Sequence, residues 1–151
     1  MGRTQKVGSL GEELVVRFLM KRGFTILDRN YRRPWGELDI VAERKNKIHF
    51  VEVKAMSQRI VSDETKSNVS SETSEREAAL AYIRSKVKKD RFSPEDHVNK
   101  EKIKRQGRII QTYLGAKHVS GETNWQFDVA SVLIDSETKK AKINLLEDLI
   151  L

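Results

Sequence analysis

The chain has 151 residues, a length typical of one domain that buries a hydrophobic core. Its 38% hydrophobic and 34% charged residues, with a mean hydropathy of −0.59, are typical of a soluble globular protein. It contains no cysteine, which excludes disulfides, thiolate nucleophiles and cysteine-ligated metal sites. Because no apolar run approaches the roughly 18 residues of a membrane span and no signal-peptide pattern opens the chain, we expect a cytoplasmic protein without a membrane partner.

The charge of the chain favours a nucleic-acid partner. The 29 Lys and Arg residues exceed the 22 Asp and Glu residues, which gives a formal net charge of +7 and a pI near 9.7. Such an excess is expected of a protein that binds nucleic acid, although an excess of lysine also serves solubility alone. Charge by itself therefore leaves both interpretations open.

The first part of the chain predicts a helix, a short strand and an irregular basic segment. A capping box at 9–12 opens the predicted helix, whose apolar residues recur at helical spacing until Gly23 ends it. Residues 24–27 predict a strand, and Pro34 disfavours regular structure in the segment 28–35. Cations and aromatic rings in this segment suit phosphate contact and base stacking, although its tryptophan suits the core equally well. The candidate nucleic-acid-binding residues here are Arg29, Tyr31, Arg32, Arg33 and Trp35.

Two runs of alternating apolar and polar residues, 38–42 and 48–54, predict a β-hairpin. If the loop is centred between Lys45 and Asn46, a loop of either two or four residues pairs positions whose numbers sum to 91. Because side chains alternate between the two faces of a sheet, this register places the charged pairs on one face and the apolar pairs on the reverse, buried face. The predicted pairs are Asp39 with Glu52, Glu37 with Lys54, Leu38 with Val53, and Ile40 with Val51.

The charged face of this hairpin predicts a divalent-metal site. Two acids that face each other across a ladder, here Asp39 and Glu52, have Cβ atoms about 5 Å apart. Their carboxylates repel unless a cation separates them or one takes up a proton. Mg²⁺, with Mn²⁺ as a substitute, prefers carboxylates together with waters and phosphate oxygens, and it polarises a scissile phosphate and helps to deprotonate an attacking water. Lys54 on the same face would orient that water and offset charge in the transition state. The alternative is a solvated face with a Glu37–Lys54 ion pair worth under about 1 kcal/mol.

The second half of the chain predicts a mobile insertion, a basic helix and two strands. Residues 56–74 lack a sustained period and begin an insertion that extends to about residue 96, within which a capping box at 74–77 predicts a helix to about Lys88. A helix follows over about 99–114, and 125–134 and 141–146 predict strands joined by a polar turn. A basic helix face is ordinarily only solvated, but this one also suits a nucleic-acid backbone. Its candidate binding residues are Lys104, Arg105 and Arg108.

Four further polar residues have both a structural and a functional interpretation. Glu12 lies near the apolar edge of the first helix and can reach the sheet, but it also completes the capping box. Lys102 lies at the margin of the apolar stripe of the later helix, where a lysine ordinarily extends to solvent. Asp128 lies among apolar residues, which favours a buried, hydrogen-bonded or helix-capping role. His49 falls opposite Ala42 on the apolar face, which favours a hydrogen-bonded core histidine.

Several motifs in a fixed order give the chain a family resemblance. It resembles the YraN-like family of small bacterial proteins, which are predicted endonucleases of the PD-(D/E)xK superfamily related to archaeal Holliday junction resolvases. The resemblance covers most of the chain outside the insertion and implies one domain with a restriction-endonuclease-like α/β fold, a mixed β-sheet flanked by helices in an αβββαβ-type core. The motifs are Gly8-Ser9-Leu10-Gly11-Glu12, Gly36 to Ala42 and Phe50 to Lys54, with His97 to Lys102 and Phe127 to Ala130 downstream.

The same resemblance implies an activity. It implies a Mg²⁺-dependent endonuclease that hydrolyses phosphodiester bonds in structured or branched DNA, and by analogy a homodimer. The long insertion after Lys54 departs from the family pattern and leaves the choice of substrate open. The alternative is a non-catalytic nucleic-acid-binding or DNA-repair accessory module with the same fold. The implied catalytic residues are Glu12, Asp39, Glu52 and Lys54, of which the three acids are also the implied metal ligands, with Glu37 and Lys102 as auxiliaries.

Overall fold

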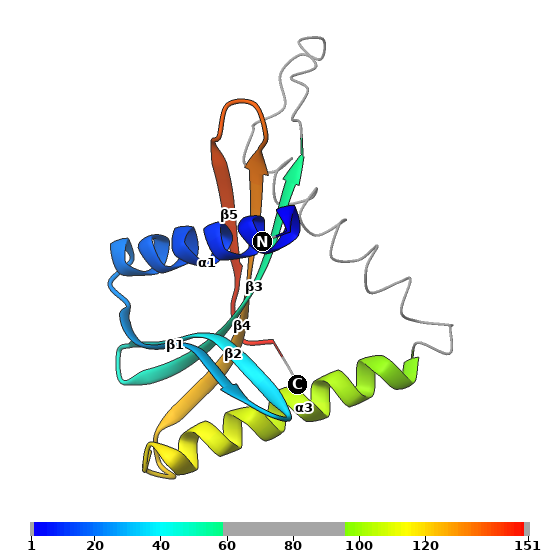
Figure 1. The fold of residues 1–151 in the computed structure, drawn as a ribbon. Helices are drawn as coiled ribbons and strands as arrows, with labels where there is room; N and C mark the ends of the chain where they lie inside the picture. Colours follow the sequence, from blue (N-terminus) through cyan, green and yellow to red (C-terminus); the bar gives the residue numbers. More distant parts are fainter. Residues whose placement is uncertain (1, 59–95, 150–151) are drawn as a thin grey trace.

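Five strands form one mixed sheet with a helix on each face. The computed structural model describes residues 2–149 except 59–95. The strand order is β1-β2-β3-β4-β5, and only the β3–β4 pair is parallel. The predicted α/β fold is thereby confirmed, consistent with a restriction-endonuclease-like core that β5 extends by one strand (Figure 1). The elements are α1 (Arg3–Lys21), β1 (Thr25–Arg33), β2 (Gly36–Arg44), β3 (Lys47–Gln58), α3 (Asp96–Ala116), β4 (Asn124–Asp135) and β5 (Ala141–Leu146).

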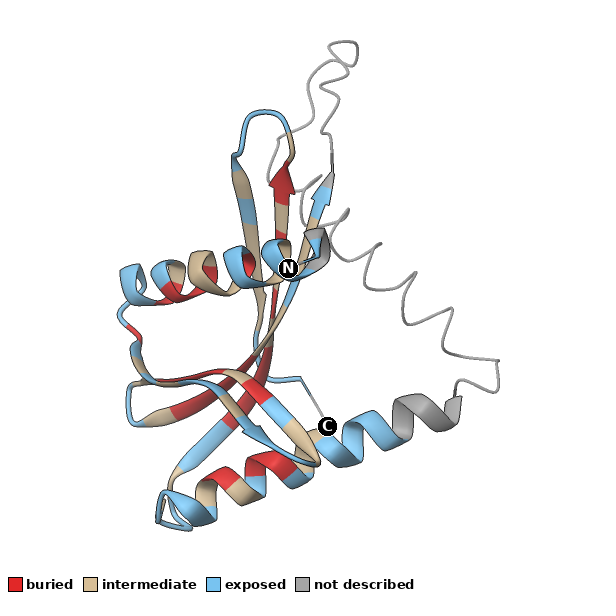
Figure 2. Ribbon diagram, viewed as in Figure 1, coloured by how far each residue is buried: buried red, intermediate tan, exposed pale blue. Residues whose placement is uncertain are grey.

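The core consists of two clusters, one between the sheet and each helix. In β3, Val51 packs with the α1-side cluster and its neighbour Phe50 with the α3-side cluster, so the helices cover opposite faces. Figure 2 shows the buried residues on the central strands and on the inward faces of both helices. The helical residues of the α1-side cluster are Val15, Val16 and Leu19, and those of the α3-side cluster are Ile109, Ile110 and Tyr113.

The first helix begins earlier than the sequence pattern predicted. α1 begins at Arg3 after an N-cap at Gly2, so residues 9–12 lie inside the helix and the predicted capping box is wrong. Val7 packs against the α1-side cluster and extends the apolar stripe by one turn towards the N-terminus. Packing of that additional turn, with no helix breaker before it, explains the longer helix.

The end of α1 was predicted correctly. Gly23 has a φ of +81°, and its N–H donates to the carbonyl of Met20 while the N–H of Phe24 donates to the carbonyl of Leu19. This is a Schellman motif, which favours glycine at the left-handed position. Phe24 and Leu19 are both buried in the α1-side cluster, so the motif directs the chain into the sheet.

The basic segment is regular, contrary to the prediction of an irregular connection. β1 continues through Arg33, and Pro34 and Trp35 form the turn before Gly36, which pairs with Arg33. Pro34 therefore lies outside the ladder, where its missing N–H costs no hydrogen bond. Tyr31 packs against the α3-side cluster, and this contact together with the pairing to β2 explains the extended conformation.

The β2–β3 turn was predicted correctly. Lys45 and Asn46 have φ angles of 52° and 59°, the left-handed pair that a two-residue type I′ hairpin turn requires. The paired residues run from Arg44 with Lys47 to Ile40 with Val51 and follow the predicted register.

β3 continues through Gln58 and α3 begins at Asp96, so this strand and this helix are longer than predicted. Residues 59–95, which belong to the predicted mobile insertion and include the helix expected after the capping box at 74–77, lie outside the described residues. β4 and β5 agree with the predicted strands, but 147–149 form no helical turn. None of the described helices is long and apolar enough to cross a membrane.

Candidate functional site

The regular alternation of β2 breaks at Asp39. Leu38 packs with the α3-side cluster and Ile40 with the α1-side cluster, although residues two apart in a regular strand share a face. Opposite this position, β1 contains Asn30 in the left-handed region with a φ of 51°. The prediction that Leu38 and Ile40 share one buried face is therefore wrong. A helix covers each face of this sheet, and the strand is distorted between these two residues.

The β2–β3 ladder opens at the same place. Its last pair is Ile40 with Val51, so the predicted pairs of Asp39 with Glu52, Glu37 with Lys54 and Leu38 with Val53 lie beyond the ladder. The Oδ2 atom of Asp39 instead accepts a hydrogen bond of 2.8 Å from the N–H of Val53. A side-chain carboxylate thus takes the place of a main-chain acceptor and is held against β3.

The opened ladder forms one wall of a cleft of about 390 Å³. Residues from α1, β2, β3 and α3 line this cleft, including every acid and both lysines that the sequence and the family resemblance singled out. These residues are separated by up to 90 positions in the chain, so only the packing of both helices on the sheet brings them together. The lining residues are Glu12, Gly36, Glu37, Asp39, Glu52, Val53, Lys54, Lys102, Arg105 and Gln106.

A buried glycine in α1 places Glu12 in this cleft. A Cβ atom on Gly11 would overlap the Cβ of Ala55 in β3 and lie 3.7 Å from a methyl of Val53. The helix can therefore approach β3 this closely only because residue 11 has no side chain. Glu12 follows directly, which explains how its carboxylate reaches the sheet instead of capping the helix.

Asp39 lies in an unfavourable electrostatic environment for a carboxylate. Its pKa is raised from 3.8 to about 6, mainly by burial and further by the negative charges of Glu12, Glu52 and Glu37, against the lowering effect of the Val53 N–H. Burial and like charges both disfavour the ionised form. A cation bound beside Asp39 would relieve both effects.

Glu52 has the opposite environment because two lysines contact it. Its Oε1 atom forms ion pairs with the Nζ atoms of Lys54 and of Lys102, the latter at 3.2 Å. Burial alone would raise the pKa of Glu52, but the two ammonium groups outweigh burial and lower it. Burial likewise lowers the pKa of Lys54, yet the Glu52 carboxylate outweighs it and the net shift is upward. Lys54 therefore remains protonated at neutral pH.

Lys102 does not simply extend to solvent. α3 presents it to Glu52 on β3, so the solvent interpretation of this helix position is wrong, although 57% of its side chain remains accessible. The residue thus belongs to the cleft, as the family resemblance implied.

The donor atoms of the cleft suit a hard divalent cation. Glu12, Asp39 and Glu52 provide carboxylate oxygens, the ligands that Mg²⁺ and Mn²⁺ prefer. The carboxylate oxygens of these three acids do not all lie within 4.8 Å of one another. Among the described residues, one other group has its ligand atoms that close together, namely His49, Asp128 and Glu147. Glu52 is held by its lysines instead.

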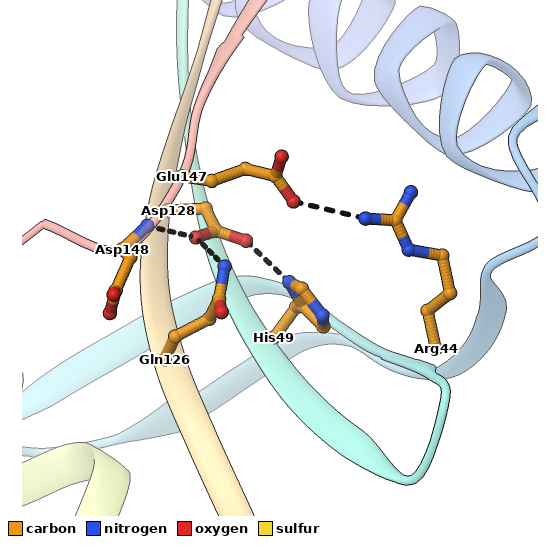
Figure 3. Close-up of polar contacts among 6 residues, drawn as sticks. All are labelled: Arg44, His49, Gln126, Asp128, Glu147 and Asp148. Atoms are coloured by element: carbon orange, nitrogen blue, oxygen red, sulfur yellow. Dashed lines mark hydrogen bonds and ion pairs between the residues drawn. The ribbon is translucent and has the colours of Figure 1, made fainter.

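That other group belongs to a polar cluster centred on Asp128, in which His49 and Asp128 are buried and Glu147 is exposed. Asp128 is fully buried, and its Oδ2 atom lies 2.7 Å from Nδ1 of His49. Its Oδ1 atom accepts 2.8 Å hydrogen bonds from the side chain of Gln126 and the backbone of Asp148. Because both oxygens are already satisfied, the cluster ties β3, β4 and the C-terminal segment together, which confirms the hydrogen-bonded roles predicted for Asp128 and His49. Figure 3 shows the cluster, which consists of Arg44, His49, Gln126, Asp128, Glu147 and Asp148.

A second hollow adjoins the cleft and shares Gly36, Glu37 and Arg105 with it. Its remaining lining comes from the β1–β2 turn and includes Arg32 and Arg33. The Nε atom of Arg32 lies 3.2 Å from a carboxylate oxygen of Glu37, and more than half of each side chain is accessible. Such an exposed ion pair is weak, so these guanidinium groups can exchange partners readily.

The two aromatic residues of the basic segment pack in the core. Tyr31 meets the ring of Tyr113 edge to face, and its buried hydroxyl has no hydrogen-bond partner among the described residues. Trp35 donates from its indole N–H to Thr112 at 3.3 Å, and the guanidinium of Arg108 lies 4.8 Å from the centre of its ring. Stacking of these rings on nucleotide bases stays an untested prediction.

The other predicted binding residues lie apart from this hollow. Arg29 forms an ion pair with Glu13 of α1 at 3.1 Å, and Lys104 is exposed on α3. Arg33, by contrast, lines the hollow and lies over the ring of Tyr31 at 4.3 Å. The predicted nucleic-acid-binding residues therefore do not form one continuous group: some line the hollow beside the cleft, some pack in the core, and Arg29 and Lys104 lie elsewhere.

Known proteins resemble this chain over most of its length. Residues 11–93, more than half of the chain, match the model of the uncharacterised protein family UPF0102. A UPF0102 protein of Alkaliphilus oremlandii is 34% identical over 146 residues, which cover 95% of this chain and 97% of the relative. The chain belongs to the UPF0102 family. A UPF0102 protein of Caldicellulosiruptor bescii is 31% identical over 145 residues, which cover 95% of this chain and 96% of that relative.

The predicted YraN-like family membership is thereby confirmed, while the name UPF0102 specifies no activity. The matched segment contains Glu12, Asp39, Glu52 and Lys54 and ends before Lys102. A UPF0102 protein of Syntrophomonas wolfei is 39% identical over 92 residues, 60% of this chain and 77% of the relative.

Proposed function

We propose that this UPF0102 protein is a divalent-metal-dependent endonuclease of the PD-(D/E)xK superfamily that hydrolyses phosphodiester bonds in structured or branched DNA. The supporting observation is the opening of the β2–β3 ladder, where Asp39 on β2 and Glu52 and Lys54 on β3 share one cleft. Glu12 from α1 joins them at the same place. An acid on one strand with an acid and a lysine on the next suits phosphodiester hydrolysis, because the acids can hold a divalent cation and the lysine can offset charge on the phosphate.

The three acids Glu12, Asp39 and Glu52 would hold Mg²⁺, for which Mn²⁺ can substitute. When bound, the cation supplies Lewis acidity at the scissile phosphate. Asp39 is positioned in advance, because the Val53 N–H holds one of its oxygens. The raised pKa of Asp39 supports the same assignment, since its buried negative charge has three carboxylates nearby and the ammonium group of Lys54, which attracts it, already forms an ion pair with Glu52.

Lys54 acts by its positive charge. Because its pKa is raised, it cannot take a proton from water at neutral pH. Its ammonium group can instead donate hydrogen bonds to a phosphate oxygen or to an attacking water, and it stabilises the negative charge that develops on the phosphate.

The adjoining hollow would bind the phosphates that flank the cleavage site. Arg32, Arg33 and Arg105 line it, and guanidinium groups bind phosphate oxygens in a bidentate manner. Such contacts carry no direct sequence information, so the substrate would be selected by its shape and by the path of its backbone. This favours structured DNA over a defined sequence.

Cleavage of labelled substrates tests this proposal. The protein is incubated with duplex, flap, four-way junction and RNA substrates in Mg²⁺ or Mn²⁺, and we expect metal-dependent cleavage that is strongest on branched DNA. Asp39→Ala and Lys54→Gln should each lower the rate by about a hundredfold or more, since the first removes a metal ligand and the second removes the positive charge beside the reacting phosphate. The matched control is Glu122→Gln, which removes an exposed carboxylate outside the cleft and should leave the rate unchanged.

Two results would contradict the proposal in different ways. Salt-sensitive binding with no cleavage of any substrate in either metal would favour the non-catalytic accessory module. Undiminished cleavage by Asp39→Ala would leave the activity in place but reject the assignment of the site.

A further inference from the structure

Charge is distributed unevenly among the acids of the cleft. One oxygen of Glu52 contacts two ammonium groups, those of Lys54 and Lys102. Asp39, in contrast, has neighbouring carboxylates that raise its pKa and a backbone N–H that lowers it, and Lys54 acts on it by its charge. Two cations therefore form ion pairs with one acid while the adjacent acid is less fully compensated.

The two lysines differ in how freely they can leave Glu52. Lys54 lies two residues farther along the same strand, so β3 keeps it beside Glu52. Lys102 comes from α3, and its side chain is 57% accessible, close to the 51% of Lys54, while that of Glu52 is only 17% accessible. Residues 101–105 of α3 are exposed, and the helix is anchored farther along by Ile109 and Ile110. The two lysines therefore differ in their backbone: Lys102 lies on an exposed part of a helix, so its side chain can leave Glu52 more freely than that of Lys54.

We propose that Lys102 is a built-in counter-ion of Glu52 that competes with a divalent cation for this carboxylate. The inference rests on the proposed metal site. Both ammonium groups contact the same oxygen, Oε1, so a metal at a coordination distance of about 2.1 Å can use this oxygen only if one of them leaves, and a metal on the other oxygen would lie close to two positive charges. Lys102 is the cation that leaves, because an exposed and flexible ion pair costs little to break.

Lys102 thereby lowers the affinity of the free protein for the metal. It also keeps the charge of Glu52 compensated while no metal is bound, which limits the repulsion among the acids of the cleft. Once displaced, its ammonium group remains at the rim of the cleft beside Arg105 and Gln106, where a substrate phosphate would lie.

Direct measurement of metal binding tests this role without any need for cleavage. Isothermal titration calorimetry with MnCl₂ would compare the wild-type protein, Lys102→Gln and Lys104→Gln. Lys104 is exposed on the same helix and outside the cleft, so its variant removes the same charge without touching Glu52. We expect Lys102→Gln to bind Mn²⁺ about three- to fivefold more tightly, the factor that corresponds to loss of one exposed competing ion pair. Lys104→Gln should bind Mn²⁺ as the wild-type protein does.

The outcomes separate this inference from the proposed function. Unchanged or weaker Mn²⁺ binding by Lys102→Gln would overturn the counter-ion role, and so would equal tightening in both variants, which would reflect net charge alone. If neither the wild-type protein nor Lys102→Gln binds Mn²⁺, the metal site fails and the proposed function fails with it. Circular dichroism during thermal unfolding checks that both variants are folded. A purely structural role for Lys102 would not tighten metal binding.

Discussion

Asp39 is held in place at a cost in stability. Its carboxylate accepts a hydrogen bond from Val53, yet burial and three neighbouring acids raise its pKa from 3.8 to about 6. Between these two pH values the folded protein binds more protons at this group than the unfolded chain does. The free energy of unfolding therefore decreases as pH rises from about 4 to 6, and the unfavourable contribution is fully present above pH 6.

A neutral side chain at this position should therefore stabilise the metal-free protein. Asp39→Asn keeps an oxygen that can accept the Val53 hydrogen bond but removes the charge. In the presence of a chelator at pH 8 we expect the variant to unfold with a free energy about 1–2 kcal/mol higher than the wild-type protein, after allowance for partial exposure of the site. Urea denaturation at pH 8 and pH 4 measures the difference, which should vanish at pH 4 because Asp39 is then largely protonated in the folded protein.

Equal stabilities of the wild-type protein and Asp39→Asn at pH 8 would show that the repulsion among the cleft acids is screened. Glu122→Gln serves as the control here also, because this exposed carboxylate lies outside the cleft and its loss should change neither value. A gain in stability together with a loss of cleavage would be typical of a residue retained for function.

Among the elements, α1 depends on one contact with β3 to place its acid. Gly11 and Gly8 lie one turn apart in the same helix, but they face different surroundings. A Cβ on Gly11 would overlap Ala55, whereas a Cβ on Gly8 would meet nothing within 4 Å. The two glycines therefore form an internal comparison.

Opposite effects on stability are expected from Gly8→Ala and Gly11→Ala. The first should raise the free energy of unfolding by about 0.5–1 kcal/mol, because alanine is the better helix former. The second should lower it by about 1–3 kcal/mol, because α1 must move away from β3. Thermal and urea denaturation measure both, and Gly11→Ala should also lower cleavage because Glu12 moves with the helix. Stabilisation by both substitutions would contradict the close contact of α1 with β3.

At the scale of the whole molecule, part of the basic excess lies where the proposed substrate would lie. The chain carries a net charge of +7, and three arginines from the β1–β2 hairpin and α3 line the hollow beside the cleft. Phosphate contacts release condensed counterions, so they make affinity strongly dependent on salt.

Replacement of these arginines should reduce that salt dependence. For the triple variant Arg32→Gln, Arg33→Gln and Arg105→Gln, we expect weaker DNA binding and a slope of log affinity against log salt that is less steep by about 2–3. Fluorescence anisotropy at several salt concentrations measures the slope. The control is Lys21→Gln, Lys45→Gln and Lys139→Gln, which removes the same charge from exposed lysines outside the hollow. An equal change in the control would show that net charge alone governs binding.

The sequence by itself determined the elements and the local part of the site. Hydrophobic periodicity, the left-handed glycine at Gly23 and the two-residue turn at Lys45 and Asn46 depend only on neighbouring residues, so the end of α1 and the register of the β2–β3 hairpin followed from the sequence. The motifs around Asp39 and Glu52 likewise indicated the family that the comparisons confirm.

Only the tertiary structure decided how these parts combine. Helix packing on both faces of the sheet breaks the alternation at Asp39, and the contact of Gly11 with β3 brings Glu12 to the sheet. Packing also turned the basic segment into a strand and placed Lys102 on Glu52. The physical reason is that these contacts join residues far apart in the chain, and their strength depends on shape and burial, which no local pattern of residues specifies.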